Sequence, residues 1–160
     1  MSTKADYTTE EWNILASLPY MIGATLVAVS KSGAIGKTRE ALSLYSKVRE
    51  TAQKFAAVPL IQELFTGGEV QVKETRKETI SEKEQLILLT FERCRAALTL
   101  LESKATPEEV EAYKQWLYQS AERIAGVSKG GGFLGIGAKR IDEQEATVLA
   151  QLREILGVQA

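Results

Sequence analysis

The stretch from Leu26 to Thr38 carries the spacing that most resembles a catalytic motif. It passes from an apolar run through a glycine-bearing turn and ends in Gly-Lys-Thr. In a phosphate-binding P-loop, backbone amides cradle the phosphates, the lysine pairs with them and the threonine holds magnesium. That motif needs glycine five positions before Gly36, where this chain has Lys31, and it needs a parallel sheet that the sequence does not predict. We therefore interpret the stretch as a turn between helices, and a small NTPase as the least favoured function.

A second glycine-rich segment, residues 129–140, reads KGGGFLGIGAKR. Its G-x-G-x-x-G spacing matches a dinucleotide fingerprint, but no strand precedes it and no helix follows at once. Because glycine is a poor helix former, the segment predicts a loop. Its three large apolar residues either pack onto the fold or bind a partner, and we expect packing; they are Phe133, Leu134 and Ile136.

Composition excludes several classes of site. The chain has no histidine, which removes the commonest general base near neutral pH and the commonest metal ligand. Zinc sites of the Cys/His kind and Ser-His or Cys-His nucleophile pairs are therefore excluded within this chain. Twenty basic residues against 21 acidic ones leave a net charge of −1, which predicts no nucleic-acid partner.

The one cysteine and the polar start of the chain favour a cytoplasmic protein. Cys94 cannot form an internal disulfide, and its place in an apolar helical pattern predicts a buried, inert thiol. The first six residues do not resemble a signal peptide. The longest weakly polar run, Leu18–Val29, is shorter than the ~20 residues that span a bilayer, so we expect no membrane segment.

Helical periodicity and capping signals recur along the whole chain. Capping boxes are expected at Thr8 with Glu11, Ser81 with Glu84, Thr106 with Glu109 and Asp142 with Glu145. Apolar residues at helical spacing predict helices over about 8–29, 37–57, 60–65, 82–103, 107–124 and 143–156. Pro19 predicts either two short helices or one kinked helix in the first of these ranges. The long fourth helix is rich in apolar residues at helical spacing, among which Cys94 falls; they are Leu86, Leu89, Phe91, Ala97 and Leu101.

These patterns predict an all-α fold, a single-domain bundle of six or seven helices over residues 1–160, with a Gly-rich loop before the last helix. Acidic residues cluster at 108–111 and 142–145. We attribute them to the first turns of helices, where the macrodipole favours negative charge. Paired carboxylates there are also the ligand type that calcium or magnesium prefers. Amphipathic helices leave a homo-oligomer possible, although no heptad repeat is sustained long enough to demand a coiled coil.

Two stretches resemble the TerB-like tellurite-resistance family. The segment IDEQE at 141–145, followed by the leucine-rich last helix, is similar to the closing segment of that family, and SGAIG at 32–36 looks like its first turn. The resemblance implies an all-helical, cytoplasmic protein linked to tellurite and stress resistance, with Asp-Gly loops and a helix-borne Glu around a metal ion. Here Ser32 stands where the family has Asp, so weak or lost metal binding is implied. The residues implied as ligands are Asp142, Glu145 and Glu40.

The function expected from all of this is a non-enzymatic protein that acts by binding in stress response. No cofactor is expected beyond a possible divalent cation. The alternative is an interaction scaffold that docks a protein or a membrane through the Gly-rich loop 129–140, using Phe133, Leu134 and Ile136 between flanking basic residues.

Overall fold

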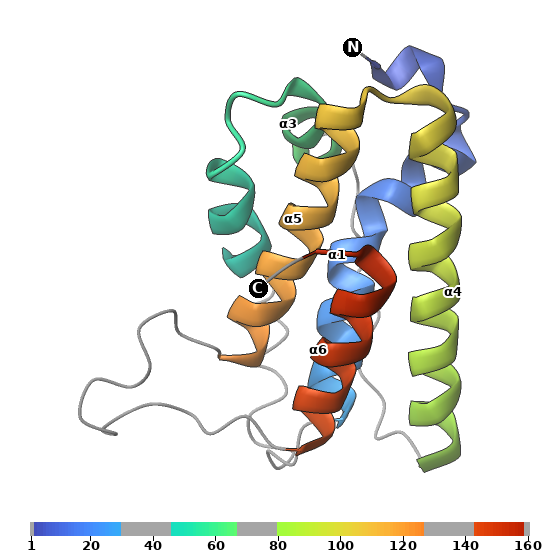
Figure 1. Cartoon of the computed structure of the whole chain (residues 1–160), viewed down its shortest axis with the longest axis vertical. Coiled ribbons are helices and arrows are strands. Elements are labelled where there is room, and N and C mark those ends of the chain that lie inside the picture. The colour runs from blue at the N-terminus through green and yellow to red at the C-terminus, as the bar shows by residue number, and fades with distance from the viewer. Residues whose placement is uncertain (1, 30–45, 67–79, 127–142, 159–160) are drawn as a thin grey trace, which may run out of the picture.

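The computed structural model describes residues 2–29, 46–66, 80–126 and 143–158. In these ranges the chain forms helices and turns and no strand, which confirms the predicted all-α bundle (Figure 1). The elements are the short η1 (Lys4–Asp6), α1 (Thr9–Val29), a helical segment over 46–53, α3 (Pro59–Thr66), α4 (Ile80–Lys104), α5 (Pro107–Ala125) and α6 (Glu143–Leu156).

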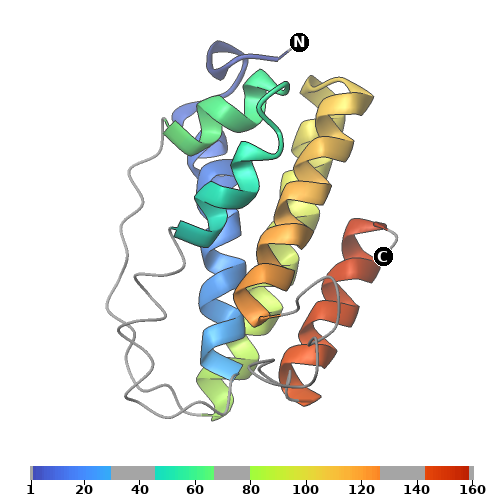
Figure 2. The same ribbon diagram turned by 90° about the vertical axis from the view of Figure 1, so that its left-hand side faces the viewer.

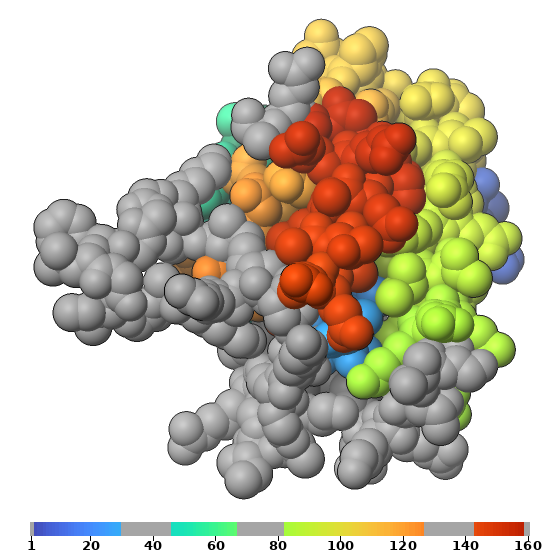
Figure 3. Space-filling view, turned by 60° about the horizontal axis from the view of Figure 1, so that its bottom comes forward, coloured from blue at the N-terminus to red at the C-terminus, as the bar shows by residue number. Residues whose placement is uncertain are grey.

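Helix α1 is the central element of the bundle. It packs against α5, α4, α3 and α6, and Figure 2 shows it behind the 46–53 segment with α5 alongside. Little of α1 reaches the face drawn in Figure 3, where α6 lies beside α4. Because neighbouring helices cover most of its surface, apolar side chains are buried on several sides of α1. The largest fully buried ones are Trp12, Leu15, Leu18, Ile22 and Leu26.

Pro19 does not interrupt α1, which runs as one helix through the proline. Proline has no backbone N–H, so the carbonyl four residues earlier, that of Leu15, loses its helical donor. The hydroxyl of Tyr113 on α5 donates to this carbonyl at 2.8 Å. A side chain from a neighbouring helix thus replaces the missing backbone bond, and the two-helix alternative was wrong.

The continuity of α1 also corrects the expectation that no helix is long enough to span a membrane. Its 21 residues, with a mean hydropathy of 1.5 over the best window, pass that test by length and composition. In the structure 61% of this window is buried within the molecule. The core helix of a soluble protein and a signal sequence near the N-terminus pass the same test, so length and composition alone are weak evidence for a membrane span.

Most helix ends lie where the sequence places them. Thr8 with Glu11 and Thr106 with Glu109 form the expected capping boxes. Gly126 at φ 81° ends α5, and Gly157 at φ 67° follows α6, both in the left-handed region that glycine tolerates. The second predicted helix ends at residue 53, earlier than expected, and is followed by a turn over 54–57.

The rotation of α4 turns part of its apolar pattern toward solvent. Phe91, Cys94, Ala97 and Leu101 are buried, but Leu89 is 42% exposed. Thr90 is buried in its place, and its hydroxyl lies 2.8 Å from that of Thr25 on α1. The apolar side chains that follow Thr90 fix the rotation, which turns Leu89 toward solvent.

Candidate functional site

The most connected polar cluster among the described residues surrounds Glu109 in the first turn of α5. Thr106 caps this helix, with Pro107 at its first position, so Glu109 is held where its carboxylate reaches back to the Thr106 amide at 3.1 Å. The same carboxylate accepts the backbone N–H of Ser2 at 3.0 Å and its hydroxyl at 3.2 Å. Tyr7 in turn donates its hydroxyl to Ser2 Oγ at 3.0 Å. The cluster joins the N-terminal segment to α5.

The hydrogen bonds around Glu109 set its ionisation state. Burial, with the residue 3% exposed, acts to raise the pKa of its carboxyl group. The donors from Ser2 and Thr106 outweigh burial, so the pKa lies below its ordinary value. Glu109 is therefore an anion at neutral pH that stabilises the fold through charge-assisted hydrogen bonds.

A serine hydroxyl hydrogen-bonded to a carboxylate can be a nucleophile with its general base, and Ser2 and Glu109 have this contact. A general base works best when its pKa lies near the working pH, and the pKa of Glu109 is shifted in the opposite direction. Ser2 is 6% exposed, which leaves little room for a substrate at its hydroxyl. The geometry therefore suits a structural clasp better than acyl transfer.

Lys104, at the end of α4, extends this clasp. Its ammonium donates to the Asp6 carbonyl at 2.8 Å and pairs with Glu11 at 2.9 Å. It also lies 5.4 Å from the centre of the Tyr7 ring, within range of a cation–π interaction. The backbone N–H of Thr8 and, after it, the Lys104 contact lower the pKa of the Glu11 carboxyl group. η1 is thus held between α1, α4 and α5.

Sequence reasoning found part of this cluster. The capping pair Thr106 and Glu109 was expected, and the acids near 108–111 were attributed to the helix dipole. The sequence indicated nothing of Ser2, Tyr7 or Lys104, because they join Glu109 only through contacts about 100 residues apart along the chain.

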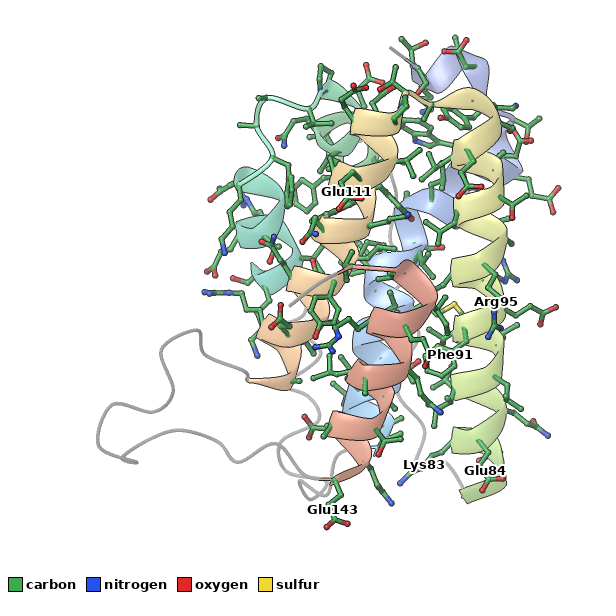
Figure 4. The ribbon with its side chains drawn as sticks, in the orientation of Figure 1. Lys83, Glu84, Phe91, Arg95, Glu111 and Glu143 are labelled. Atoms are coloured by element: carbon green, nitrogen blue, oxygen red, sulfur yellow. The ribbon has the colours of Figure 1, made fainter. Side chains whose placement is uncertain are left out.

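The predicted cation ligands are only partly within the described residues. Glu145 is 2% exposed in the first turn of α6, whereas Glu143 at the start of that helix points away from the bundle (Figure 4). Asp142 and Glu40 lie outside the described residues, as do Phe133, Leu134 and Ile136. Within the described ranges, no group of three or more acidic or cysteine side chains is placed to hold a metal ion.

Cys94 has the properties expected of an inert thiol. Its side chain is fully buried on α4, beside Phe91, which points toward α6 in Figure 4. Burial raises the pKa of the thiol to about 12. At neutral pH it is therefore a small apolar side chain rather than a nucleophile.

The exposed apolar surface of the described residues is concentrated on α4. Leu88 is 68% exposed and Leu89 42%, and they are the large hydrophobic residues that the described structure leaves in solvent. Neighbouring exposed leucines on a helix have the chemistry of a binding surface. The sequence pattern included Leu89 among the apolar residues of this helix and did not indicate that either leucine faces solvent.

No family model matches the chain, and neither a curated protein nor a solved structure matches it. The resemblance to TerB-like proteins therefore stays a prediction that rests on the two short stretches that carry it.

Proposed function

We propose that this chain is a non-enzymatic helical protein that acts by binding, of the TerB-like kind, with weak or lost metal binding and a role in stress response. The observation that carries the proposal is that the reactive side chains of the described residues take part in hydrogen bonds or packing that stabilise the fold. Glu109 and Ser2 hold the N-terminal segment, Tyr113 serves a backbone carbonyl, and Cys94 is a buried thiol with a pKa raised to about 12.

Support for the TerB-like part comes from the helical order and from the sequence at 32–36 and 141–145. A cation, if one is held, is assigned to Asp142, Glu145 and Glu40, because carboxylate oxygens are the ligands that calcium and magnesium prefer. Glu145, one of these acids, is buried in the first turn of α6.

Titration calorimetry with calcium, magnesium and zinc tests the cation. We expect weak binding, with dissociation constants in the high micromolar to millimolar range, that Glu145→Gln and Asp142→Asn abolish. Glu143→Gln is the matched control, since this acid lies in the same turn and is exposed. Absence of heat with all three ions removes the cation and leaves a binding protein without metal.

The second candidate is docking of a protein or a membrane through residues 129–140. It is favoured by Phe133, Leu134 and Ile136 lying between Lys129, Lys139 and Arg140, a composition suited to a bilayer interface. Co-sedimentation with vesicles of anionic phospholipid compares the natural chain with Phe133→Asp. Pelleting that this substitution abolishes would favour the membrane, whereas the proposal above predicts no pelleting of either protein.

A further inference from the structure

Residues 2–7 lie at one end of the bundle, where side chains of α1, α3, α4 and α5 contact them (Figures 1 and 2). We call these residues the N-terminal strap. Among the described residues, the backbone–backbone hydrogen bonds of the strap lie within it. Only Ser2 and Tyr7 of the strap are buried. Side chains of the bundle therefore hold the strap in place, with few apolar contacts.

Carboxylate oxygens accept hydrogen bonds from the backbone of the strap. The donor and acceptor pairs are Ser2 with Glu109 at 3.0 Å, Thr3 with Asp6 at 2.7 Å, Lys4 with Glu63 at 3.4 Å and, where the strap joins α1, Thr8 with Glu11 at 2.8 Å. A hydrogen bond to a carboxylate is about twice as strong as one to a neutral acceptor. Protonation of these acids therefore weakens all of these contacts together.

The helices are held to one another in a different way. Buried apolar side chains from every described α-helix form one cluster, and the burial of apolar surface does not depend on the protonation of carboxylates. Acid therefore weakens the attachment of the strap more than it weakens the packing of the bundle.

Tyr7 is the large side chain that the strap places against the core. Its ring centre lies 5.6 Å from that of Trp12, which is 1% exposed. Within the described part of the chain, Nε1 of Trp12 has no hydrogen-bond partner. A buried indole N–H without an acceptor is destabilising, and it gains an acceptor when water reaches the ring. The free-energy cost of uncovering Trp12 is therefore reduced.

The titration of the carboxylates gives the direction of the pH effect. Burial acts to raise the pKa of the Glu109 carboxyl group, but its hydrogen-bond donors lower that pKa below the ordinary value of 4.5. The N–H of Thr8 and, after it, Lys104 lower the pKa of Glu11. Groups whose pKa is lowered in the attached state take up protons on detachment, so detachment is favoured as pH falls below 4.5. The charged groups that face the strap are Lys4 and Asp6 on η1, Glu11 on α1, Glu63 on α3, Lys104 on α4 and Glu109 on α5.

We propose that the N-terminal strap is an acid-released cover of Trp12, which detaches while the bundle stays folded. At neutral pH the carboxylates keep the strap attached, and it leaves as a unit when they gain protons. The equilibrium constant of detachment changes by up to about tenfold per pH unit for each carboxyl group that gains a proton. When Glu109 and Glu11 both do so, the change is up to about a hundredfold. This release is independent of cation or membrane binding, which involve other residues.

A nitroxide label on the full chain tests the release. Ala5 is exposed, and a label on Ala5→Cys reports on the strap alone because Cys94 is buried. We expect electron paramagnetic resonance to show this label becoming mobile as pH falls below 4.5, while circular dichroism of the helices stays unchanged. A label on Ala146→Cys, an exposed position on α6, is the control and keeps its mobility over the same range. A strap label that is already mobile at pH 7, or that stays immobile until the helices unfold, overturns the proposal.

Glutamine variants of the labelled chain test the role of the carboxylates. Glu109→Gln and Glu11→Gln each remove one titrating group, so the pH dependence of detachment falls from up to about a hundredfold to up to about tenfold per pH unit. Glu108→Gln and Glu10→Gln, exposed acids next to them in the sequence, are the controls and keep the natural profile. Circular dichroism verifies that each variant is folded. If Glu109→Gln and Glu11→Gln both keep the natural profile, other groups release the strap and the proposal is wrong.

Acrylamide quenching of tryptophan fluorescence tests what the strap covers. In the natural chain we expect quenching to be stronger at the pH where the strap label is mobile than at pH 7. The increase should be absent from Trp12→Phe, which keeps only Trp116, a side chain at 0% exposure. An increase that persists in Trp12→Phe would mean that acid opens the core around Trp116, and it would overturn the proposal of a cover over Trp12.

Discussion

At the scale of single residues, Glu109 shows how one buried charge can organise a distant part of the chain. Its carboxylate accepts bonds from Ser2 and Thr106, and it is a capping residue of α5 at the same time. If the Glu109 carboxylate were removed, these donors would lose their acceptor without gaining water in its place. The free-energy cost of taking them out of water would then no longer be offset by a hydrogen bond. The energetic effect of Glu109 therefore exceeds that of an ordinary capping glutamate.

We expect Glu109→Ala to lower the free energy of unfolding by about 2–3 kcal/mol at pH 7, and Glu109→Gln by about 1 kcal/mol. The carboxyl pKa is lowered in the folded state, so its contribution is complete above the ordinary value of 4.5 and is lost as pH falls through the lowered value. Urea unfolding at pH 7 and at pH 3 measures this. The difference between the natural chain and Glu109→Gln should shrink at the lower pH. Glu108→Gln, an exposed acid one position earlier, is the control and should be nearly neutral. An undiminished difference at pH 3 would show that the charge of Glu109 does not stabilise the fold.

The thiol of Cys94 gives a second test at this scale. Because burial raises its pKa to about 12, we expect its reaction with a disulfide reagent at pH 8 to be slowed by about a hundredfold or more relative to the unfolded chain. Measuring the rate with and without denaturant gives the comparison, and Cys94→Ala gives the background. Rapid labelling of the native protein would contradict the buried position.

At the scale of elements, α1 depends on α5 for its continuity. The carbonyl of Leu15 has no helical donor because residue 19 is proline, and Tyr113 supplies one. Full burial raises the pKa of this hydroxyl well above the ordinary value of 10.0, so it remains a donor at all ordinary pH values. A similar pairing of Thr25 with Thr90 joins α1 to α4 and gives the buried Thr90 hydroxyl a partner.

We expect Tyr113→Phe to cost about 1–3 kcal/mol, because it leaves the Leu15 carbonyl buried without a partner. In a Pro19→Ala background, the N–H of residue 19 can donate to that carbonyl, so the same change should cost about 1 kcal/mol less. A double-mutant cycle of unfolding free energies measures the coupling. Tyr118→Phe on the same helix is the control and should show no coupling to position 19. Additive effects of Tyr113→Phe and Pro19→Ala would mean that the hydroxyl does not replace the missing bond.

In the molecule as a whole, the buried apolar side chains form one cluster drawn from every described α-helix. Trp12 on α1 and Trp116 on α5 both lie within it, at 1% and 0% exposure. The N-terminal segment is fastened to α4 and α5, so the first and middle thirds of the chain share contacts. The described helices therefore share one core, and one domain over residues 1–160 stays a prediction.

We therefore expect one cooperative unfolding transition. Tryptophan fluorescence, which reports on the core, and circular dichroism, which reports on all helices, should give the same midpoint in urea. Trp12→Phe and Trp116→Phe each leave one tryptophan, so the two fluorescence signals can be measured separately. For each variant, the urea midpoint from fluorescence should agree with the midpoint from circular dichroism. Separate midpoints would divide the chain into independently unfolding parts.

The helical class, most of the helix ends and the burial of Cys94 could be predicted from the sequence. These follow from local rules, since periodicity, capping pairs and glycine conformations involve residues within a few positions of each other. The continuity of α1 through Pro19, the exposure of Leu89 and the contact of Glu109 with Ser2 depend instead on how the helices pack. Each of these depends on a partner far along the chain: Tyr113 for the carbonyl of Leu15, Thr25 for Thr90, and Ser2 for Glu109. A buried polar group is almost always hydrogen-bonded, and its partner can come from any part of the fold. The spacing of residues in the sequence does not indicate which partner that is.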